Sequence, residues 1–222
     1  ILRNVARWTV AVEGAAAVLL TGRFWTTYDM DLPAALGMGV FHAVSAFCNA
    51  GFAMYPDSFE RYVGDPLLNP VMGITIILGG VGFPVLSEVL RERRTPSRWS
   101  VHTRLTLSIS AVLLAVGAAT VLLFEWSNPG TLGPLGFVDK LTAGAFQGIT
   151  PRTAGFNTLD YAEMQDSTLL VQTILMFIGA GSASTAGGIK VTTFALLAFV
   201  IWSEVRGHTE VHVFRRRVPA VA

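Results

Sequence analysis

Two short loops in this sequence carry the same residues, Ala-Gly-Phe, at the end of similar apolar segments. The first triplet begins at Ala50 and the second at Ala154. Phe-His-Ala-Val-Ser, residues 41–45, precedes the first triplet, and Phe-Gln-Gly-Ile-Thr, residues 146–150, precedes the second, with one residue fewer before the triplet. A single triplet of this kind is an ordinary tight turn, but its repetition in the same setting indicates an internal duplication.

The chemistry that these triplets offer is coordination of a cation by backbone carbonyl groups. A glycine lets successive carbonyls point one way, because it adopts backbone angles that a Cβ disfavours. Rings of carbonyl oxygens can replace the hydration shell of K+, as in the Thr-Val-Gly-Tyr-Gly pattern of potassium channels. The sequence therefore predicts two filter segments that bind K+. They comprise Asn49, Ala50, Gly51, Phe52 and Ala53 in the first, and Thr153, Ala154, Gly155, Phe156 and Asn157 in the second.

A glycine-rich stretch follows the second triplet and interrupts the last apolar segment. Helix is disfavoured there, because each glycine costs about 1 kcal/mol relative to alanine. Irregular backbone at membrane depth is tolerated only where it lines a cavity, so residues 179–190 are predicted to form such a loop. The stretch is not a phosphate-binding loop, because Ile189 separates Gly188 from Lys190 and no strand–turn–helix unit surrounds it.

The elements that position these loops are apolar segments of two lengths. Three long segments match one crossing of a hydrocarbon core of about 30 Å, and a fourth is longer and contains the glycine-rich stretch. These segments are residues 5–21, 67–90, 103–124 and 168–202. The segments 36–47 and 137–150 are too short to span and are typical of re-entrant pore helices. We expect an all-α membrane protein with two tandem span–pore-loop–span repeats, residues 1–104 with a cytoplasmic link and 105–222 with a cytoplasmic tail.

The distribution of charge predicts the orientation in the membrane. Arginines gather before the first span, between the second and third spans, and after the fourth, whereas the opposite loops are mostly acidic. By the positive-inside rule, both termini and the link 91–104 are cytoplasmic. The short helices then enter from outside and direct their negative C-terminal ends toward the pore centre. The acidic outer loops either raise the local cation concentration or have no special purpose, and both interpretations stay open.

Composition excludes several classes of function. Of the 222 residues, 52% are hydrophobic and 14% are charged, against about 25% charged in soluble domains, which indicates a lipid environment. The net charge of +1 gives no reason to expect a nucleic-acid partner, and the single Cys48 excludes an internal disulfide framework. The histidines lack metal-ligand spacing, and no catalytic Ser/His/Asp or Cys/His arrangement is present, so we expect neither an enzyme nor a cofactor on this chain. The histidines are His42, His102, His208 and His212.

Motifs along nearly the whole chain resemble those of the Trk/Ktr/HKT superfamily of potassium transporters, in particular its TrkH/KtrB-like pore-forming subunits. Residues 45–52 look like the filter of that family's second repeat, and residues 152–157 look like the filter of its third. Residues 79–84 resemble the kinked inner helix of the second repeat. Residues 182–193 closely resemble the intramembrane loop that interrupts the inner helix of the third repeat.

The resemblance implies K+ uptake by a multi-pass protein of the bacterial cytoplasmic (inner) membrane, with the intramembrane loop as its gate. The gate residues are Gly179, Gly181, Ser182, Ser184, Thr185, Gly187, Gly188 and Lys190. It also implies a homodimer of full-length subunits on a cytoplasmic TrkA/KtrA-like ring of nucleotide-binding regulatory proteins. The arginine-rich link 91–104 and the tail from Arg206 to Arg217 face the side where that ring would dock.

The family pore contains four repeats, whereas this sequence carries only the second and third. We therefore expect a fragment of a longer chain, with a pore made of two such chains as the alternative. Two other functions stay open: a non-conducting half-pore scaffold that needs partner repeats, and a Na+-selective relative. The sequence does not decide between K+ and Na+, because the filter of the first repeat weighs on that preference in the family.

Overall fold

The computed structural model describes residues 2–206, 211–213 and 216–218. His208 and the predicted cytoplasmic Arg215 lie outside the described residues. The helices are α1 (Leu2–Thr27), α2 (Leu32–Phe47), α3 (Leu68–Val81), α4 (Phe83–Arg91), α5 (Val101–Glu125), α6 (Phe137–Ile149), α7 (Asp166–Phe177) and α8 (Val191–Val205). Short 3-10 helices lie at Glu60–Tyr62, Pro96–Arg98 and Tyr161–Glu163. The predicted all-α fold is confirmed, apart from one small antiparallel pair near the C-terminus, β1 (Val211–Val213) and β2 (Arg216–Val218).

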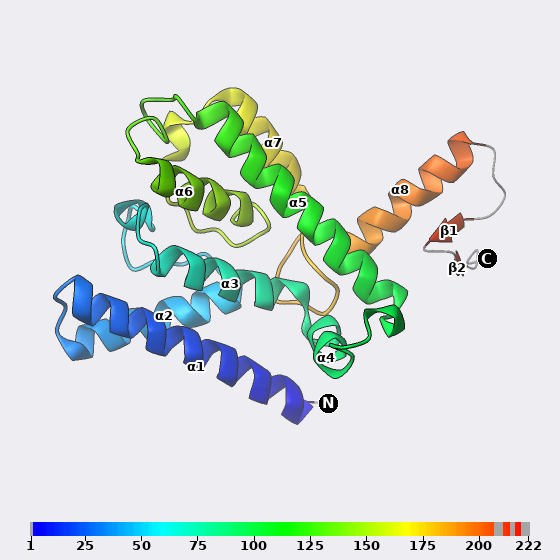
Figure 1. The fold of residues 1–222 in the computed structure, drawn as a ribbon, viewed down its shortest axis with the longest axis horizontal. Helices are drawn as coiled ribbons and strands as arrows, with labels where there is room; N and C mark the ends of the chain where they lie inside the picture. Colours follow the sequence, from blue (N-terminus) through cyan, green and yellow to red (C-terminus); the bar gives the residue numbers. More distant parts are fainter. Residues whose placement is uncertain (1, 207–210, 214–215, 219–222) are drawn as a thin grey trace.

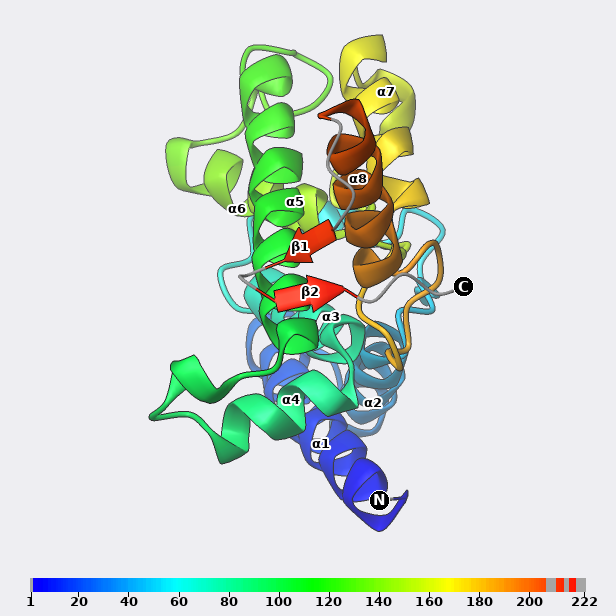
Figure 2. The same ribbon diagram turned by 90° about the vertical axis from the view of Figure 1, so that its right-hand side faces the viewer.

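The helices form two similar halves that lie side by side (Figure 1). In the first half, the long helix α1 packs along the shorter α2, and α3 follows. In the second half, α5 takes the place of α1, α6 that of α2, and α7 that of α3. Figure 2 shows α5 and α8 beside each other, with the β1–β2 pair next to them. This arrangement agrees with two tandem repeats.

Within the described residues, α1 and α5 are long and apolar enough to cross a membrane, and α3 with α4 would count as a third crossing if taken together. The fourth predicted crossing consists of two shorter apolar helices, α7 and α8, joined by residues 178–190. The predicted break in this segment is therefore confirmed.

The predicted second span, residues 67–90, is two helices with a sharp bend between them, and the bend lies within residues 79–84, whose resemblance to a kinked inner helix implies it. The chain bends by 98° between α3 and α4, at Gly82, whose φ of +91° is rarely adopted by residues with a Cβ. Pro84 then occupies the first turn of α4, where the absence of an N–H is tolerated. The Glu88 carboxylate fixes α4 against the start of α5, because it accepts hydrogen bonds from Ser100 N at 2.9 Å and from the Thr103 hydroxyl.

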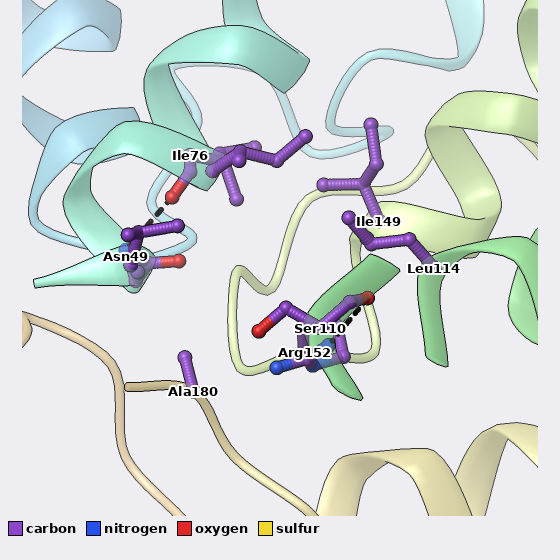
Figure 3. Close-up of a pocket in the computed structure, with 10 residues that line it drawn as sticks. Asn49, Ile76, Ser110, Leu114, Ile149, Arg152 and Ala180 are labelled. Carbon is purple, nitrogen blue, oxygen red and sulfur yellow. Dashed lines mark hydrogen bonds between the residues drawn. The ribbon is translucent and has the colours of Figure 1, made fainter. Parts of the chain in front are cut away.

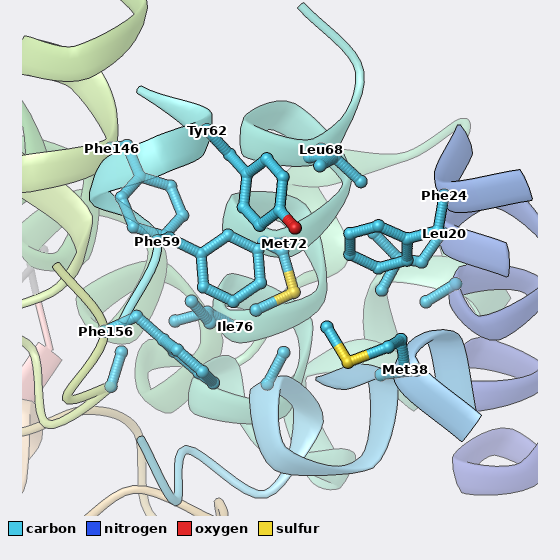
Figure 4. Packing of buried hydrophobic residues seen from close by; sticks show 14 of the residues in the cluster. Leu20, Phe24, Met38, Phe59, Tyr62, Leu68, Met72, Ile76, Phe146 and Phe156 are labelled. Carbon is cyan, nitrogen blue, oxygen red and sulfur yellow. The ribbon is translucent and has the colours of Figure 1, made fainter. Parts of the chain in front are cut away.

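One hydrophobic core joins the two halves behind the triplets (Figure 4). Phe24 of α1, Phe146 of α6 and Phe156 of the second triplet are almost fully buried in it. Phe59, from the loop before α3, packs edge-on against Phe156 with ring centroids 5.6 Å apart. Close packing of these side chains holds the second triplet against the first half, since van der Waals contact is a main source of association between helices in a membrane.

Asp65 ties the end of α1 to the start of α3. Its Oδ1 accepts the N–H groups of Leu67 and Leu68, both at 2.8 Å, and its Oδ2 accepts from Arg23 at 2.9 Å and from the Tyr28 hydroxyl at 2.7 Å. Burial alone would raise the pKa of this carboxyl group, but these four donors together hold it below the usual range. The charged form of Asp65 therefore stabilises the fold.

We expect Asp65→Asn to lower the free energy of unfolding by about 2 kcal/mol near neutral pH, because hydrogen bonds to a charged group are lost. Since the folded-state pKa is lowered, the contribution of Asp65 is complete above the ordinary carboxyl range and disappears as the pH falls through the folded-state value. Thermal unfolding in detergent at a series of pH values should thus show the two proteins converging in acid. Asp57→Asn, at an exposed ion pair with Arg61, is the control and should change little; a pH-independent difference for Asp65→Asn would contradict this account.

Candidate functional site

The two predicted filter segments adopt the same unusual backbone conformation. We refer to residues 49–53 as the first triplet loop and to residues 153–157 as the second triplet loop. Gly51 and Gly155 both have positive φ, +73° and +81°. Two residues earlier, Asn49 and Thr153 also have positive φ, +50° and +67°, although both carry a Cβ. Non-glycine residues rarely take this conformation, so its appearance at equivalent positions marks a geometry that both repeats maintain.

The two triplet loops meet at their glycines. A Cβ added to Gly51 would lie 2.7 Å from the Gly155 Cα, and one added to Gly155 would lie 2.9 Å from the Gly51 Cα. Both distances are too short for real carbon atoms, so only glycine fits at either position. The structure therefore brings the two triplets, far apart in the sequence, into backbone contact at one place.

A hydroxyl group holds the same carbonyl in each loop. The Ser45 hydroxyl at the end of α2 donates to the Phe52 carbonyl at 2.8 Å. The Thr150 hydroxyl after α6 donates to the Phe156 carbonyl. Ser45 and Thr150 occupy matching positions in the two copies of the repeated segment, so the extra residue of the first copy is accommodated between the hydroxyl and the triplet.

A second pair of matching side chains holds the chain beyond each triplet. His42 Nδ1 lies 2.8 Å from the Met38 carbonyl oxygen and therefore carries the proton, which leaves Nε2 to accept the Met54 N–H at 3.3 Å. In the second repeat, Gln147 Oε1 accepts the Thr158 N–H at 3.4 Å. In each repeat, two side chains from the short helix or from the residue that caps its C-terminal end thus fix the loop that follows.

The end of the second triplet loop is held by the first repeat. The Asn157 N–H donates to Ser58 Oγ at 3.2 Å, and the Asn157 carbonyl accepts the Phe59 N–H at 2.9 Å. The Asn157 side chain donates to Glu60 Oε1 at 2.7 Å. Burial and the nearby charge of Asp160 raise the pKa of Glu60, although the bond from Asn157 opposes this. Acidic groups therefore surround this end of the site.

The triplet phenylalanines differ in their surroundings. Phe156 is fully buried in the core, whereas 69% of Phe52 is exposed. Ala154 is likewise buried and Ala50 exposed. The second triplet loop is therefore covered at Ala154 and Phe156, whereas the first is exposed at Ala50 and Phe52.

Residues 178–190, which we call the interrupting loop, separate α7 from α8. Its ends are joined, because Gly179 N–H donates to the Ile189 carbonyl at 3.0 Å and Ile189 N–H donates to the Phe177 carbonyl at 3.2 Å. Lys190 Nζ donates back into the loop, to the Ala186 carbonyl. The two ends of the loop are therefore hydrogen-bonded to each other, and the backbone between them departs from the helix axis.

The tip of the interrupting loop is hydrogen-bonded to both triplet loops. The Thr185 hydroxyl donates to the Phe47 carbonyl at 2.8 Å and accepts from Asn49 Nδ2 at 2.8 Å. The Gly187 N–H donates to the Thr153 hydroxyl at 3.0 Å. The predicted filter residues and the predicted gate residues are thus in direct contact.

The interrupting loop also rests on the end of α3. Gly181 N–H donates to the Gly80 carbonyl at 2.9 Å, and Thr185 N–H donates to the Gly79 carbonyl at 3.3 Å. Ser182 and Thr192 share a hydroxyl–hydroxyl bond of 3.0 Å between the loop and α8. The buried hydroxyl of Ser184 has no partner among the residues that the structure describes.

Arg152, which precedes the second triplet loop, is buried and connects three elements. Its Nη1 donates to the Ser110 carbonyl of α5 at 3.3 Å (Figure 3). Its Nη2 donates to the Gly179 carbonyl at the start of the interrupting loop at 2.8 Å. The side chain therefore braces the second triplet loop from behind.

The sequence alone does not indicate the supporting roles of Ser45, Thr150, His42 and Gln147, although these residues lie in the repeated segments. Ser45 and Thr150 both carry a hydroxyl group at matching positions, and this is the one feature of the sequence that points to their shared role. His42 and Gln147 differ in type and share only their position, so their common role emerges from the structure.

The arrangement offers a cation backbone oxygens rather than side-chain ligands. In the part of the chain that the structure describes, no three His, Cys, Asp or Glu side chains come together as a metal-binding group. The carbonyls of residues 49–51 and 153–155 accept no hydrogen bond from described residues. These are the oxygens that remain available for a partially dehydrated ion.

The chain is similar to known transport proteins along almost its whole length. Residues 8–220 match the sequence profile of the TrkH family, described as cation transport proteins. The chain is 46% identical to Ktr system potassium uptake protein B of Bacillus subtilis (strain 168), over 95% of this chain and 47% of the relative. It is 36% identical to the protein of the same name from Vibrio alginolyticus, over 98% of this chain and 48% of the relative.

The fold is similar to a solved structure, the crystal structure of the potassium transporter TrkH from Vibrio parahaemolyticus, with a TM-score of 0.68. The two chains are 19% identical in sequence, and the match covers 92% of this chain and 42% of the other. The chain spans about half the length of the curated relatives that it matches.

We expect Thr150→Val to lower the free energy of unfolding by about 1–3 kcal/mol, because it leaves a buried carbonyl, that of Phe156, unpaired. Valine has nearly the shape of threonine, so the change removes the hydrogen bond with little effect on packing. Thr150→Ser keeps the hydroxyl and should lose less. Thermal unfolding of the three proteins in detergent tests this, and equal stability of the Val variant and the unsubstituted protein would show that the bond is unimportant.

Proposed function

This chain belongs to the TrkH family of cation transport proteins, and on that premise we propose that it forms two of the four repeats of a potassium-uptake pore. Residues 1–104 are the second repeat and residues 105–222 are the third. The proposed activity is K+ movement into a bacterial cell, down its electrochemical gradient, and it is not an enzymatic reaction.

The observation that carries this proposal is the contact between Gly51 and Gly155. Two loops with matching positive φ angles meet there backbone to backbone, each at the C-terminal end of a short helix. Negative helix ends and carbonyl oxygens favour a cation. An ordinary turn needs neither the duplication nor the contact, so ion coordination explains both features together.

We assign the ion-binding role chiefly to the carbonyls of residues 49–51 and 153–155. The Phe52 and Phe156 carbonyls each accept a hydroxyl group, and the Asn157 carbonyl accepts the Phe59 N–H. We therefore assign these three oxygens chiefly to holding the loops in place. Each keeps a second lone pair that is free of that hydrogen bond. Two further repeats would supply the remaining oxygens of each ring.

The proposed gate is residues 179–190 of the interrupting loop. Thr185 and Gly187 contact the two triplet loops directly, so the closed loop lies next to the proposed ion path. Movement of the loop would open that path. Lys190 adds a positive charge to this segment, which opposes cation passage while the loop is in place.

The proposed location is the bacterial cytoplasmic membrane, with both termini and the link 91–104 on the cytoplasmic side. The apolar helices and the membership of a transport family support a membrane location, and the arginine distribution supports the orientation. The full polypeptide would form a homodimer. A TrkA/KtrA-like ring of nucleotide-binding proteins would regulate it from the cytoplasmic side.

Growth of a K+-uptake-deficient bacterium on low K+ tests the proposed function. We expect rescue by the complete four-repeat polypeptide and no rescue by this 222-residue chain alone. Gly155→Asp should abolish rescue, because its side chain cannot fit against Gly51. Ala195→Val, at a buried position of α8 outside the triplet loops, serves as the expression-matched control and should retain rescue.

Each other outcome selects a different function. Rescue by the short chain alone would mean that two copies assemble one pore. Failure of both proteins despite membrane expression would favour the non-conducting scaffold. Uptake of Na+ in preference to K+ by the purified, reconstituted protein would identify a Na+-selective relative.

Deletion of residues 182–187 tests the gate. We expect at least a several-fold increase in K+ flux through the complete protein, because the deletion removes the loop tip that contacts both triplet loops. Flux of K+ or Rb+ into proteoliposomes measures this. Unchanged or lower flux in a well-expressed variant would count against the interrupting loop as a gate.

A further inference from the structure

A small cavity lies between the two repeats, behind the triplet loops. Its walls come from α3, α5, both loop regions and the interrupting loop, and include Asn49, Ile77, Ser110, Leu114, Arg152 and Ala180 (Figure 3). The space open to the centres of water-sized spheres is about 30 Å³. One water needs roughly 10–15 Å³ by this measure, so the cavity has room for at least one.

One wall of the cavity carries a hydrogen-bond acceptor. Asn49 Nδ2 faces three oxygens, the Thr185 hydroxyl at 2.8 Å and the carbonyls of Phe47 and Ile76 at 3.3 and 3.4 Å. Because carbonyl oxygens only accept, they fix which end of the amide is the NH₂ group. Asn49 Oδ1 is then left buried, and it has no partner among the described residues.

Another wall carries a hydrogen-bond donor. Arg152 is 5% exposed, and its two terminal nitrogens donate to the Ser110 and Gly179 carbonyls. Its Nε–H is buried and finds no acceptor within residues 2–206. No carboxylate in that range lies within ion-pair distance of the guanidinium. An unpaired donor of a charged group is costly to bury.

We propose that this cavity holds ordered water that accepts a hydrogen bond from Arg152 Nε and donates one to Asn49 Oδ1. Water is suited to both groups because it donates and accepts at once. An anion would face the Asn49 oxygen, and a cation would face the arginine, so neither fits both walls. Buried polar atoms that lack a protein partner are the usual sites of such water.

The water completes a ring of contacts that joins the first triplet loop, the interrupting loop and Arg152, which directly precedes the second triplet loop. The ring runs from Asn49 to Thr185, along the interrupting loop to Gly179, and then through Arg152 and the water back to Asn49. The two triplet loops are thereby held at a fixed spacing from behind. On the proposed transport function, this spacing sets the size of the ion site and hence the preference for K+ over Na+.

The direct test is a structure of the complete transporter at a resolution that reveals ordered water. We expect density within hydrogen-bond distance of Arg152 Nε and Asn49 Oδ1. An empty cavity would overturn the proposal, as would an anomalous signal at this position after soaking with bromide, which would identify an anion. This measurement does not depend on transport, so it still decides the water site if the proposed function fails.

The role in ion preference is tested with Ala180→Val, which places two methyl groups at the cavity wall without altering Asn49 or Arg152. We expect loss of the water density and about a tenfold fall in the K+/Na+ selectivity ratio, equivalent to about 1.4 kcal/mol. Ala195→Val, the same change at a buried alanine away from the cavity, should keep both. Loss of the water with unchanged selectivity would overturn the coupling role, and if Ala180→Val does not fold, the density in the unsubstituted protein remains decisive.

Discussion

Backbone groups at membrane depth find no water in the lipid, so an irregular segment must find its partners within the protein or in a cavity that holds water or ions. This constraint accounts for most of the specific contacts in the structure. The triplet loops and the interrupting loop leave regular helix between apolar segments, and side-chain hydrogen bonds hold each of them. Their mutual contacts follow from the same requirement, because each loop is the nearest source of donors and acceptors for the others.

The two repeats satisfy this constraint with the same positions and partly different chemistry. Ser45 and Thr150 are both hydroxyl donors, so the position has kept its chemistry. His42 and Gln147 have kept only the property of presenting an acceptor to a backbone N–H. The open side of the first triplet loop and the covered side of the second show that the repeats differ in their surroundings more than in their internal geometry.

Much of the fold could be predicted from apolar segment length. The short segments 36–47 and 137–150 correspond closely to α2 and α6, and the glycine-rich break falls between α7 and α8. The hydrophobic pattern alone does not indicate the bend at Gly82, because residues 67–90 are apolar on both sides of it. The β1–β2 pair was also missed, since its strands are only three residues long.

The candidate site was less predictable than the fold. The glycines of the triplets stand out in the sequence, and their contact in space is consistent with a shared role. No residue type in the sequence indicates the positive φ of Asn49 and Thr153, because many residue types precede the glycine of such a loop. The cavity between Asn49 and Arg152 depends on how α3 and α5 pack together, which no local pattern contains.

The end of α3 determines a contact between the two repeats. In a continuous helix, the Gly80 carbonyl would accept the N–H of the residue four positions later, which is Pro84 and has none. The helix has already ended at Val81, before Gly82 with its φ of +91°, so the carbonyls of both Gly79 and Gly80 are left vacant at the end of α3. The N–H groups of Thr185 and Gly181 of the other repeat fill them. The early end of α3 in one half of the molecule therefore creates the docking point for the interrupting loop of the other half.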